Sequence, residues 1–265
     1  MIVYLDTSVV LRVLFAQPDP LAEWGRWEEA YTSELTGVEA RRAVDRLRLG
    51  QALEDEKMLE LFKGLDGRIV DLEQGIFDDS IDPNTFDDVR SAGDPELGVD
   101  VPASEDLAKL GRRSRFATVY LVWDGSELKR IILPIRGAGM WALMSGYLAL
   151  ESDLNTIADA TFYKQAETPG LGDQITRPDW LARWQGRQVY DASGSPAFAV
   201  GPGTIQPGTA AAQHKVDALT GATITADAVT ALVHYWLGAH GFQPLLNQLR
   251  EQPPTQVAAD EPGES

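Results

Sequence analysis

The sequence predicts an α+β fold in which an antiparallel sheet with flanking helices follows a short β-α-α segment. The first observation behind this prediction is a hairpin pattern, because strand-like residues 116–123 and 128–135 flank the turn dipeptide Asp124-Gly125. The second is a helical pattern over residues 225–240. The third is a change of character near residues 66–75, where helical patterns give way to strands and turns.

The N-terminal part, residues 1–65, shows one short strand followed by two helical stretches. Residues Ile2 to Leu5 form an apolar run that suits a strand. Residues 35–53 and 54–62 then place apolar side chains at helical spacing among charged ones. Together these patterns predict the β-α-α segment.

The central part, residues 66–250, is rich in predicted strands. A turn-rich stretch from Asp78 to Pro102 precedes the hairpin, and Gly137-Ala138-Gly139 is expected to end the hairpin's second strand before the apolar run Met140 to Leu150. Further strands are predicted at Thr156–Tyr163, Gln188–Asp191 and Ala197–Val200.

The helix near the C-terminus has the clearest pattern of any element. We expect Thr225 to cap its start, and Gly238 and Gly241 weaken its end. Beyond it, residues 251–265 are rich in Pro, Gln, Ala and acidic residues, which predicts a disordered tail. The apolar face of the helix consists of Val229, Leu232, Val233, Trp236 and Leu237.

Composition limits the possible chemistry. The 265 residues are 44% hydrophobic, which is enough for a real core. Because 40 acidic residues outnumber 23 basic ones, the net charge of −17 favours no nucleic-acid partner, and any bound phosphate must be held locally. The chain has no cysteine and only 3 histidines, which excludes iron–sulfur clusters and thiolate zinc sites and makes a histidine metal site unfavourable. Redox chemistry would therefore need an organic cofactor.

No part of the sequence looks like a membrane segment. No run approaches the ~20 apolar residues that a spanning helix needs. The N-terminus has no basic region followed by an apolar stretch, so it does not resemble a signal peptide. We therefore expect a soluble chain that is not exported.

A segment of small and hydroxyl-bearing residues leads into the C-terminal helix. Residues 217–225 read Asp-Ala-Leu-Thr-Gly-Ala-Thr-Ile-Thr. Gly221 and Ala222 let a ligand approach the backbone closely, and the N–H groups at a helix start bind anions. Thr220 and Thr223 lie where a phosphate would sit. A plain capping turn is the alternative interpretation of these residues.

A second motif, residues 167–172, reads Glu-Thr-Pro-Gly-Leu-Gly, which on its own is an ordinary turn. Together the two motifs resemble the flavin-binding domain of the C subunit of the sodium-translocating NADH:quinone oxidoreductase. The resemblance covers about residues 66–250. Other matching segments include Asp94-Pro95-Glu96-Leu97, Val101-Pro102, Arg112-Arg113, Val119-Tyr120-Leu121-Val122, Arg136-Gly137-Ala138-Gly139-Met140-Trp141, Gly146-Tyr147, Trp236-Leu237-Gly238 and Gly241-Phe242.

The resemblance implies a covalent cofactor. In that family FMN is attached as a phosphoester to the last Thr of a Ser/Thr-Gly-Ala-Thr segment, which here is Thr223, and Thr220 stands where Ser is more usual. No His or Lys lies beside Thr223 in the sequence to activate its hydroxyl, so a separate flavin transferase is expected to make the bond. Thr223 is then an acceptor and not a catalyst.

The flavin ring needs apolar neighbours and a polar edge contact. Leu171, Trp141 and Met144 are candidates to flank the ring, and ordinary core packing is the alternative for Trp141 and Met144. The backbone amides of the turn that contains Thr168, Gly170, Leu171 and Gly172 are candidates to bond its polar edge.

The resemblance implies an electron-relay flavoprotein subunit of an ion-translocating NADH:quinone oxidoreductase. Its partners would be the other subunits of a membrane respiratory complex, in which the family member is anchored by one helix and holds its FMN domain in the periplasm. An alternative is the flavoprotein subunit of the related ferredoxin-linked electron-transport complex, which shares the threonine motif.

The N-terminal residues suggest a third hypothesis. Met1 to Ser8, Thr32 to Leu35 and Val38 to Ala43 resemble the first half of a PIN-domain toxin ribonuclease, a family that would hold Mg²⁺ with Asp6 and Glu39. The further acidic ligands are missing, because the sequence after residue 66 follows the flavoprotein. A helix cap at Asp6 and a solvated charge at Glu39 are the alternatives.

The sequence thus resembles a join between two families. Members of the flavoprotein family begin with a membrane-spanning helix, and no segment of this sequence resembles that helix. Residues 68–72 resemble both families. A natural or artificial fusion, a designed chimera and a wrongly assigned reading frame would each explain such a join.

Overall fold

A computed structural model describes residues 2–4, 29–31, 65–201, 205 and 208–256. The chain divides into two compact units, Met1–Leu65 and Asp66–Ser265.

In the first unit, strand β1 (Ile2–Tyr4) pairs in parallel with strand β2 (Glu29–Tyr31). The strand predicted at the N-terminus is therefore present. The helices predicted at residues 35–53 and 54–62 lie outside the described residues, as do the proposed metal ligands Asp6 and Glu39.

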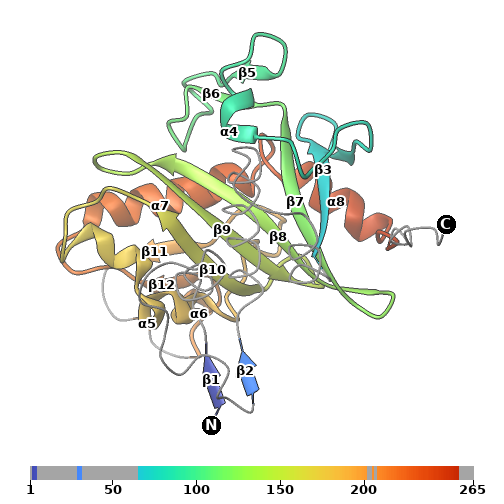
Figure 1. Cartoon of the computed structure of the whole chain (residues 1–265). Coiled ribbons are helices and arrows are strands. Elements are labelled where there is room, and N and C mark those ends of the chain that lie inside the picture. Colours follow the sequence, from blue (N-terminus) through green and yellow to red (C-terminus); the bar gives the residue numbers. More distant parts are fainter. Residues whose placement is uncertain (1, 5–28, 32–64, 202–204, 206–207, 257–265) are drawn as a thin grey trace, which may run out of the picture. The chain divides into compact units, whose positions relative to one another are not determined.

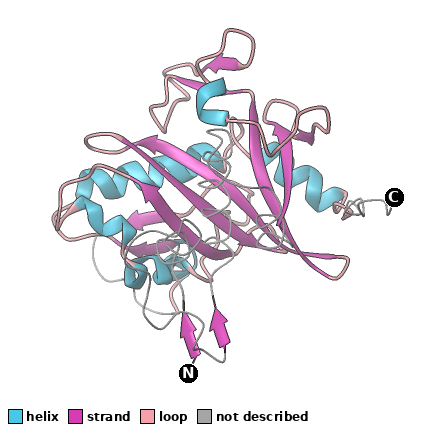
Figure 2. Cartoon of the chain, viewed as in Figure 1, coloured by secondary structure: helices cyan, strands magenta, loops and turns pink. Residues whose placement is uncertain are grey.

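The second unit is built on a six-stranded sheet with the order β10-β9-β8-β7-β3-β4 (Figure 1). Neighbours β3–β4, β7–β8, β8–β9 and β9–β10 are antiparallel. Strands dominate this unit and helices lie beside them (Figure 2), which confirms the predicted α+β class. The sheet consists of β3 (Leu65–Asp71), β4 (Ile76–Phe77), β7 (Phe116–Asp124), β8 (Glu127–Ala138), β9 (Leu143–Glu151) and β10 (Ile157–Lys164).

Smaller elements complete the second unit. Two-stranded sheets are formed by β5 (Gly98–Asp100) with β6 (Arg112–Ser114), antiparallel, and by β11 (Ala199–Gly201) with β12 (Lys215–Asp217), parallel. The helices are α4 (Asp88–Ser91), α5 (Pro178–Leu181), α6 (Ala210–His214), α7 (Thr223–Trp236) and α8 (Gln243–Glu251), with the 3₁₀ helices η1 (Gly172–Thr176) and η2 (Ala182–Trp184).

The central hairpin forms as predicted. β7 and β8 pair around Asp124-Gly125, where Gly125 has a φ of +60°, a conformation that glycine adopts at little cost. β8 continues to Ala138, so Gly137 lies inside the strand and the chain turns only after it. Most of the apolar run Met140 to Leu150 is strand β9, whose central residues are buried.

Helix α7 packs on strand β8. This packing sets the direction of the helix and therefore the place of its first residue, Thr223. Val229, Leu232 and Val233 are completely buried in the core. The helix lies close to the strand at Gly137, where an added Cβ would be 3.2 Å from that of Leu232. At its far end the Trp236 indole donates a hydrogen bond to the carbonyl of Arg136 at 2.6 Å.

Two predicted elements need correction. Residues 188–191 make only isolated bridges, because their amides bond to separate parts of the chain: Val189 N donates to the carbonyl of Asn155, Tyr190 N to the side-chain oxygen of Asn155, and Gln188 N to the carbonyl of Gln213. Helix α7 begins at Thr223, two residues earlier than predicted.

Helix α8 is absent from the prediction. Its apolar side chains Leu245, Leu246 and Leu249 are few, but all three are buried in the core.

The tail that was predicted to be disordered begins at residue 251. Residues 252–256 form neither helix nor strand, and residues 257–265 lie outside the described part.

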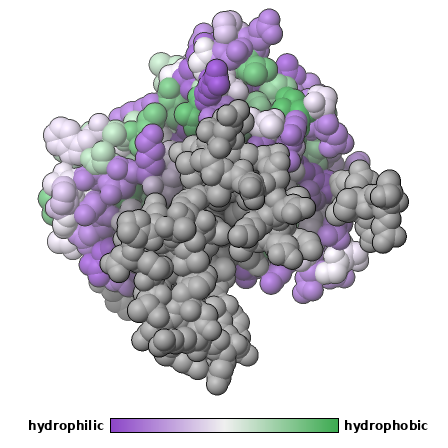
Figure 3. All heavy atoms as spheres, in the orientation of Figure 1, coloured by the Kyte–Doolittle hydropathy of each residue, from purple (hydrophilic) through white to green (hydrophobic). Residues whose placement is uncertain are grey.

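The described surface is largely polar on the face that Figure 3 shows. On the face shown in Figure 3, the described residues that are visible are mostly hydrophilic, with hydrophobic residues in small patches. No helix among the described residues is long and apolar enough to cross a membrane.

Candidate functional site

The fold brings both sequence motifs to one place. The loop of residues 139–142 after β8, the turn 167–172 after β10 and the start of α7 lie at the same end of the sheet (Figure 1). Leu171 from the turn lies against Gly221, because an added Cβ at Gly221 would be 3.0 Å from Leu171 Cδ2. The two motifs, some fifty residues apart in sequence, therefore form one site, as the resemblance implies.

A buried carboxylate connects these three segments. The Glu167 residue is 4% exposed. Its Oε1 accepts hydrogen bonds from the backbone N–H groups of Met140 at 2.9 Å and Trp141 at 3.3 Å. Its Oε2 accepts the hydroxyl proton of Thr225 on α7. Glu167 is the central residue of the site, although in the sequence it stands out only as the first residue of a turn motif.

The contact between Glu167 and Thr225 explains why residue 172 of the motif is a glycine. A Cβ added there would lie 2.7 Å from Thr225 Oγ1 and 2.9 Å from Glu167 Cβ. Both distances are shorter than real Cβ contacts, so only glycine lets the turn and the helix meet.

We expect Gly172→Ala to destabilise the second unit by about 1–3 kcal/mol, because the methyl group pushes Glu167 and Thr225 apart. Chemical denaturation measures the loss. Gly170→Ala is the comparison: Gly170 has a φ of +76° and nothing within 4 Å of an added Cβ, so strain there comes from the backbone alone. Because Gly172 has no positive φ, any loss there comes from the contact, and a loss below about 0.5 kcal/mol in Gly172→Ala would show that the contact has no importance.

Thr223 is the first residue of α7, and its side chain is exposed. The N-cap residue is Ala222, and no side chain caps this helix. Gly221 before it has a φ of +76°, which turns the chain into the helix. The Thr223 hydroxyl therefore lies at the positive end of a 14-residue helix whose first N–H groups lack a side-chain cap. Thr220 is exposed nearby.

Large apolar side chains are exposed around Thr223. Trp141 is 66% exposed, Leu171 42% and Ile224 58%. The Trp141 indole donates a hydrogen bond to the Thr168 hydroxyl at 3.0 Å, which ties the loop to the turn. Met140 and Leu143 are also exposed. Exposed apolar side chains that lie together mark binding surfaces.

The predicted site residues do not all lie at this surface. Met144 is completely buried in the core, which matches its alternative interpretation as core packing. Trp141 is exposed, which does not match core packing.

Thr225 does not have the predicted role. It does not cap the helix, because it lies inside the first turn, is 2% exposed and donates its hydroxyl proton to Glu167. The sequence pattern suggested a cap because Thr is frequent at helix starts. In the structure this threonine instead connects the helix to the 167–172 turn.

We therefore expect Thr225→Val to destabilise the second unit by about 1–3 kcal/mol, because Glu167 loses a buried donor and keeps its charge. Thr230→Val is the matched control. The Thr230 hydroxyl bonds to the carbonyl of Ala226 and accepts from Val200 N, and no carboxylate accepts its proton. Thermal unfolding of the two variants compares the losses, and a smaller loss for Thr225→Val than for Thr230→Val would contradict this interpretation.

The comparisons with known proteins agree with this site. The family described as FMN-binding domain matches residues 139–238, which span all three segments. The C subunit of the Na(+)-translocating NADH-quinone reductase of Pseudomonas aeruginosa is 46% identical over 184 residues, which are 69% of this chain and 70% of that protein. The equivalent protein of Vibrio anguillarum is 37% identical over 72% of this chain and 74% of its own length.

Solved structures show the same fold. The crystal structure of Shewanella oneidensis NqrC superposes with a TM-score of 0.70 at 32% identity, covering 81% of this chain and all of that one. The corresponding reductase subunit from Parabacteroides distasonis superposes with a TM-score of 0.55 at 23% identity, covering 81% of this chain and 98% of that one.

Fold and site thus define an FMN-binding-domain protein. The chain belongs to the NqrC family, whose members are the C subunit of the Na(+)-translocating NADH-quinone reductase, an oxidoreductase. The comparisons give no support to the ferredoxin-linked alternative, to the ribonuclease hypothesis or to the PIN-like interpretation of residues 1–65. Among the described residues, no group of three or more His, Cys, Asp or Glu side chains is arranged to hold a metal ion.

Proposed function

We propose that this protein carries FMN as a phosphoester on Thr223 and relays electrons within a membrane-bound NADH-quinone reductase. The observation that supports this most directly is the placement of Thr223. Its hydroxyl is exposed at an uncapped helix start, next to exposed Trp141, Leu171 and Ile224. FMN, when bound, supplies transfer of one or two electrons.

The residues around Thr223 have separate roles in this proposal. The first N–H groups of α7 face the phosphate, and the positive end of the helix dipole stabilises its negative charge. This local stabilisation lets a chain of net charge −17 hold a phosphate. Trp141, Leu171 and Ile224 offer apolar contact to a flavin ring. Glu167 holds the loop, the turn and the helix together.

The chain does not attach the flavin by itself. The His and Lys side chains nearest in sequence, Lys215 and His214, lie eight and nine residues before Thr223, so nothing beside its hydroxyl in the sequence can remove the proton. We therefore propose that a separate flavin transferase makes the bond. Membrane partners are proposed on the basis of the relatives, which are subunits of a translocating reductase.

Mass spectrometry of the intact protein tests the proposal. After co-expression with a flavin transferase, the mass should increase by that of one FMN minus one water, and the denatured band should fluoresce. A protein that shows no increase and does not absorb above 400 nm would refute both covalent attachment and flavin binding.

A further inference from the structure

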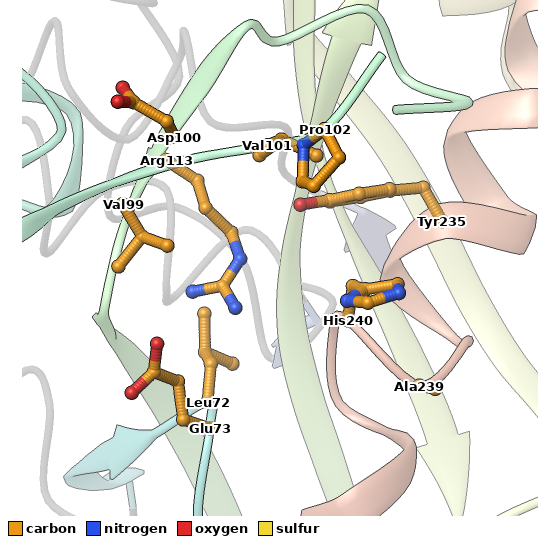
Figure 4. A pocket seen from close by; sticks show the side chains of 10 residues that line it. All are labelled: Leu72, Glu73, Val99, Asp100, Val101, Pro102, Arg113, Tyr235, Ala239 and His240. Carbon is orange, nitrogen blue, oxygen red and sulfur yellow. The ribbon is translucent and has the colours of Figure 1, made fainter. Parts of the chain in front are cut away.

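A cavity that is separate from the Thr223 site lies at the other end of helix α7. Its volume is about 270 Å³ (Figure 4). Tyr235 lines it from the last turn of α7, twelve residues and about 18 Å along the helix from Thr223. Leu72, Val99, Val101 and Pro102 contribute apolar walls. A cavity of this size suits a small molecule and is too small for a flavin.

The cavity contains a buried positive charge. Arg113 is 5% exposed, and its guanidinium points into the space in Figure 4. One of its nitrogens donates to the carbonyl of Ser114 at 2.9 Å. Within the described part of the chain, no carboxylate lies within ion-pair distance of Arg113. A buried charge is costly unless it is paired, so an anion is the natural partner.

The acidic residues of the lining are engaged elsewhere. Asp100 pairs with Arg112 at 3.1 Å, and Glu73 lies 3.8 Å from the guanidinium of Arg115. The Asp100 side chain is 90% exposed and that of Glu73 49%, whereas Arg113 is buried. Arg113 is therefore the buried charge of the lining, and the carboxylate of Asp106 is near enough to act on Tyr235 as well.

A buried hydroxyl group faces the same space. Tyr235 is 2% exposed, and its hydroxyl makes no hydrogen bond of good geometry among the described residues, although the Arg113 side chain lies close enough to interact with it. Burial raises the pKa of this hydroxyl, although the nearby Arg113 opposes the shift, so the group stays protonated at neutral pH. In Figure 4 the Tyr235 hydroxyl points towards the side of the cavity where Arg113 lies. His240 lies at the cavity too and pairs with Glu105 at 3.1 Å.

We propose that this cavity binds a small carboxylate whose charged end lies between Arg113 and Tyr235. The planar guanidinium and one O–H donor match the oxygens of a carboxylate. The accessible lining is more polar than apolar, and Leu72, Val99, Val101 and Pro102 leave room for a short tail only. This proposal concerns a site separate from Thr223 and does not depend on the flavin.

Butyrate is the probe, titrated against the full chain and followed by NMR, with chloride added to the reference sample to keep the ionic strength equal. We expect saturable shifts of residues that line the cavity. Tyr235→Phe should weaken binding about tenfold, because a hydrogen bond to a charged group is lost. Its stability should not fall, because the variant removes only a hydroxyl that makes no hydrogen bond of good geometry among the described residues.

Tyr190→Phe is the matched control. Tyr190 is 4% exposed, its hydroxyl also makes no hydrogen bond among the described residues, and it does not line the cavity. We expect it to bind butyrate like the parent protein. Arg113→Gln should bind at least tenfold more weakly. Absence of saturable shifts in the parent, or equal binding by the Tyr235 and Tyr190 variants, would overturn the proposal.

Inorganic phosphate in a parallel titration tests the chemical class. One buried guanidinium matches the single charge of butyrate, whereas the second charge of phosphate would stay unpaired, so butyrate should bind more tightly than phosphate. Tighter binding of phosphate, lost in Arg113→Gln, would show an anion site of another kind and would overturn the assignment of a carboxylate.

Discussion

Thr223→Val is expected to abolish covalent flavin attachment while leaving the fold intact. Valine keeps the β-branched shape of threonine but has no hydroxyl to carry the phosphoester. Because the Thr223 side chain is exposed, the free energy of unfolding should change by no more than about 0.5 kcal/mol. After co-expression with the transferase, the parent should show the FMN mass increase and the variant should show none.

Two further variants test the position of attachment. Thr223→Ser should keep part of the attachment, because only a methyl group is lost. Thr220→Ser is the control, since Thr220 is an exposed threonine of the same motif that lies before the helix, and serine is the more usual residue at its position. It should carry flavin like the parent. Peptide mapping that found the flavin on Thr220 would contradict the assignment to Thr223.

The sequence predicted β7, β8 and β10 because local signals determine these strands, whereas β3 and β4 were not predicted and β9 stood out only as an apolar run. The turn at Asp124-Gly125 and the apolar runs beside it specify β7 and β8 without help from distant residues. The two motifs with hydroxyls and glycines lie together in the structure, and the ligand site at this place stays a prediction. Residues 188–191 were wrongly predicted as a strand, because the amides of Val189 and Tyr190 bond to Asn155 and the sequence does not show such a partner.

Burial explains what else the sequence could not show. Thr225 follows the motif threonine by two residues, and nothing in the sequence distinguishes a cap from a buried donor. The difference depends on Glu167, 58 residues earlier in the chain. Met144 and Trp141 lie three residues apart, yet one is in the core and the other is exposed, because the chain enters strand β9 between them.

Glu167→Ala is expected to destabilise the second unit by about 2–4 kcal/mol and to reduce flavin attachment. The variant leaves the N–H groups of Met140 and Trp141 and the hydroxyl of Thr225 without their shared acceptor. For a unit of this size, the loss corresponds to a decrease in Tm of about 5–15 °C. Thermal unfolding measures the first effect and the intact mass after co-expression measures the second.

Glu167→Gln separates the hydrogen bonds from the charge. A glutamine oxygen can still accept from Met140 and Trp141, and the Thr225 hydroxyl can turn to accept from the new amide. Its loss of stability should therefore be smaller, about 1 kcal/mol. Glu151→Gln is the control, because Glu151 is a partly exposed carboxylate that pairs with Arg130 at 3.2 Å. That pair contributes less than about 1 kcal/mol.

The combination of outcomes decides what Glu167 does. If Glu167 positions the site, attachment should decrease in Glu167→Ala even at a temperature where the variant is fully folded, because the loop bearing Trp141 is no longer tied to the start of α7. Glu167→Gln should recover most of that attachment. Normal attachment in folded Glu167→Ala would show that this carboxylate stabilises the fold and has no part in presenting Thr223 to the transferase.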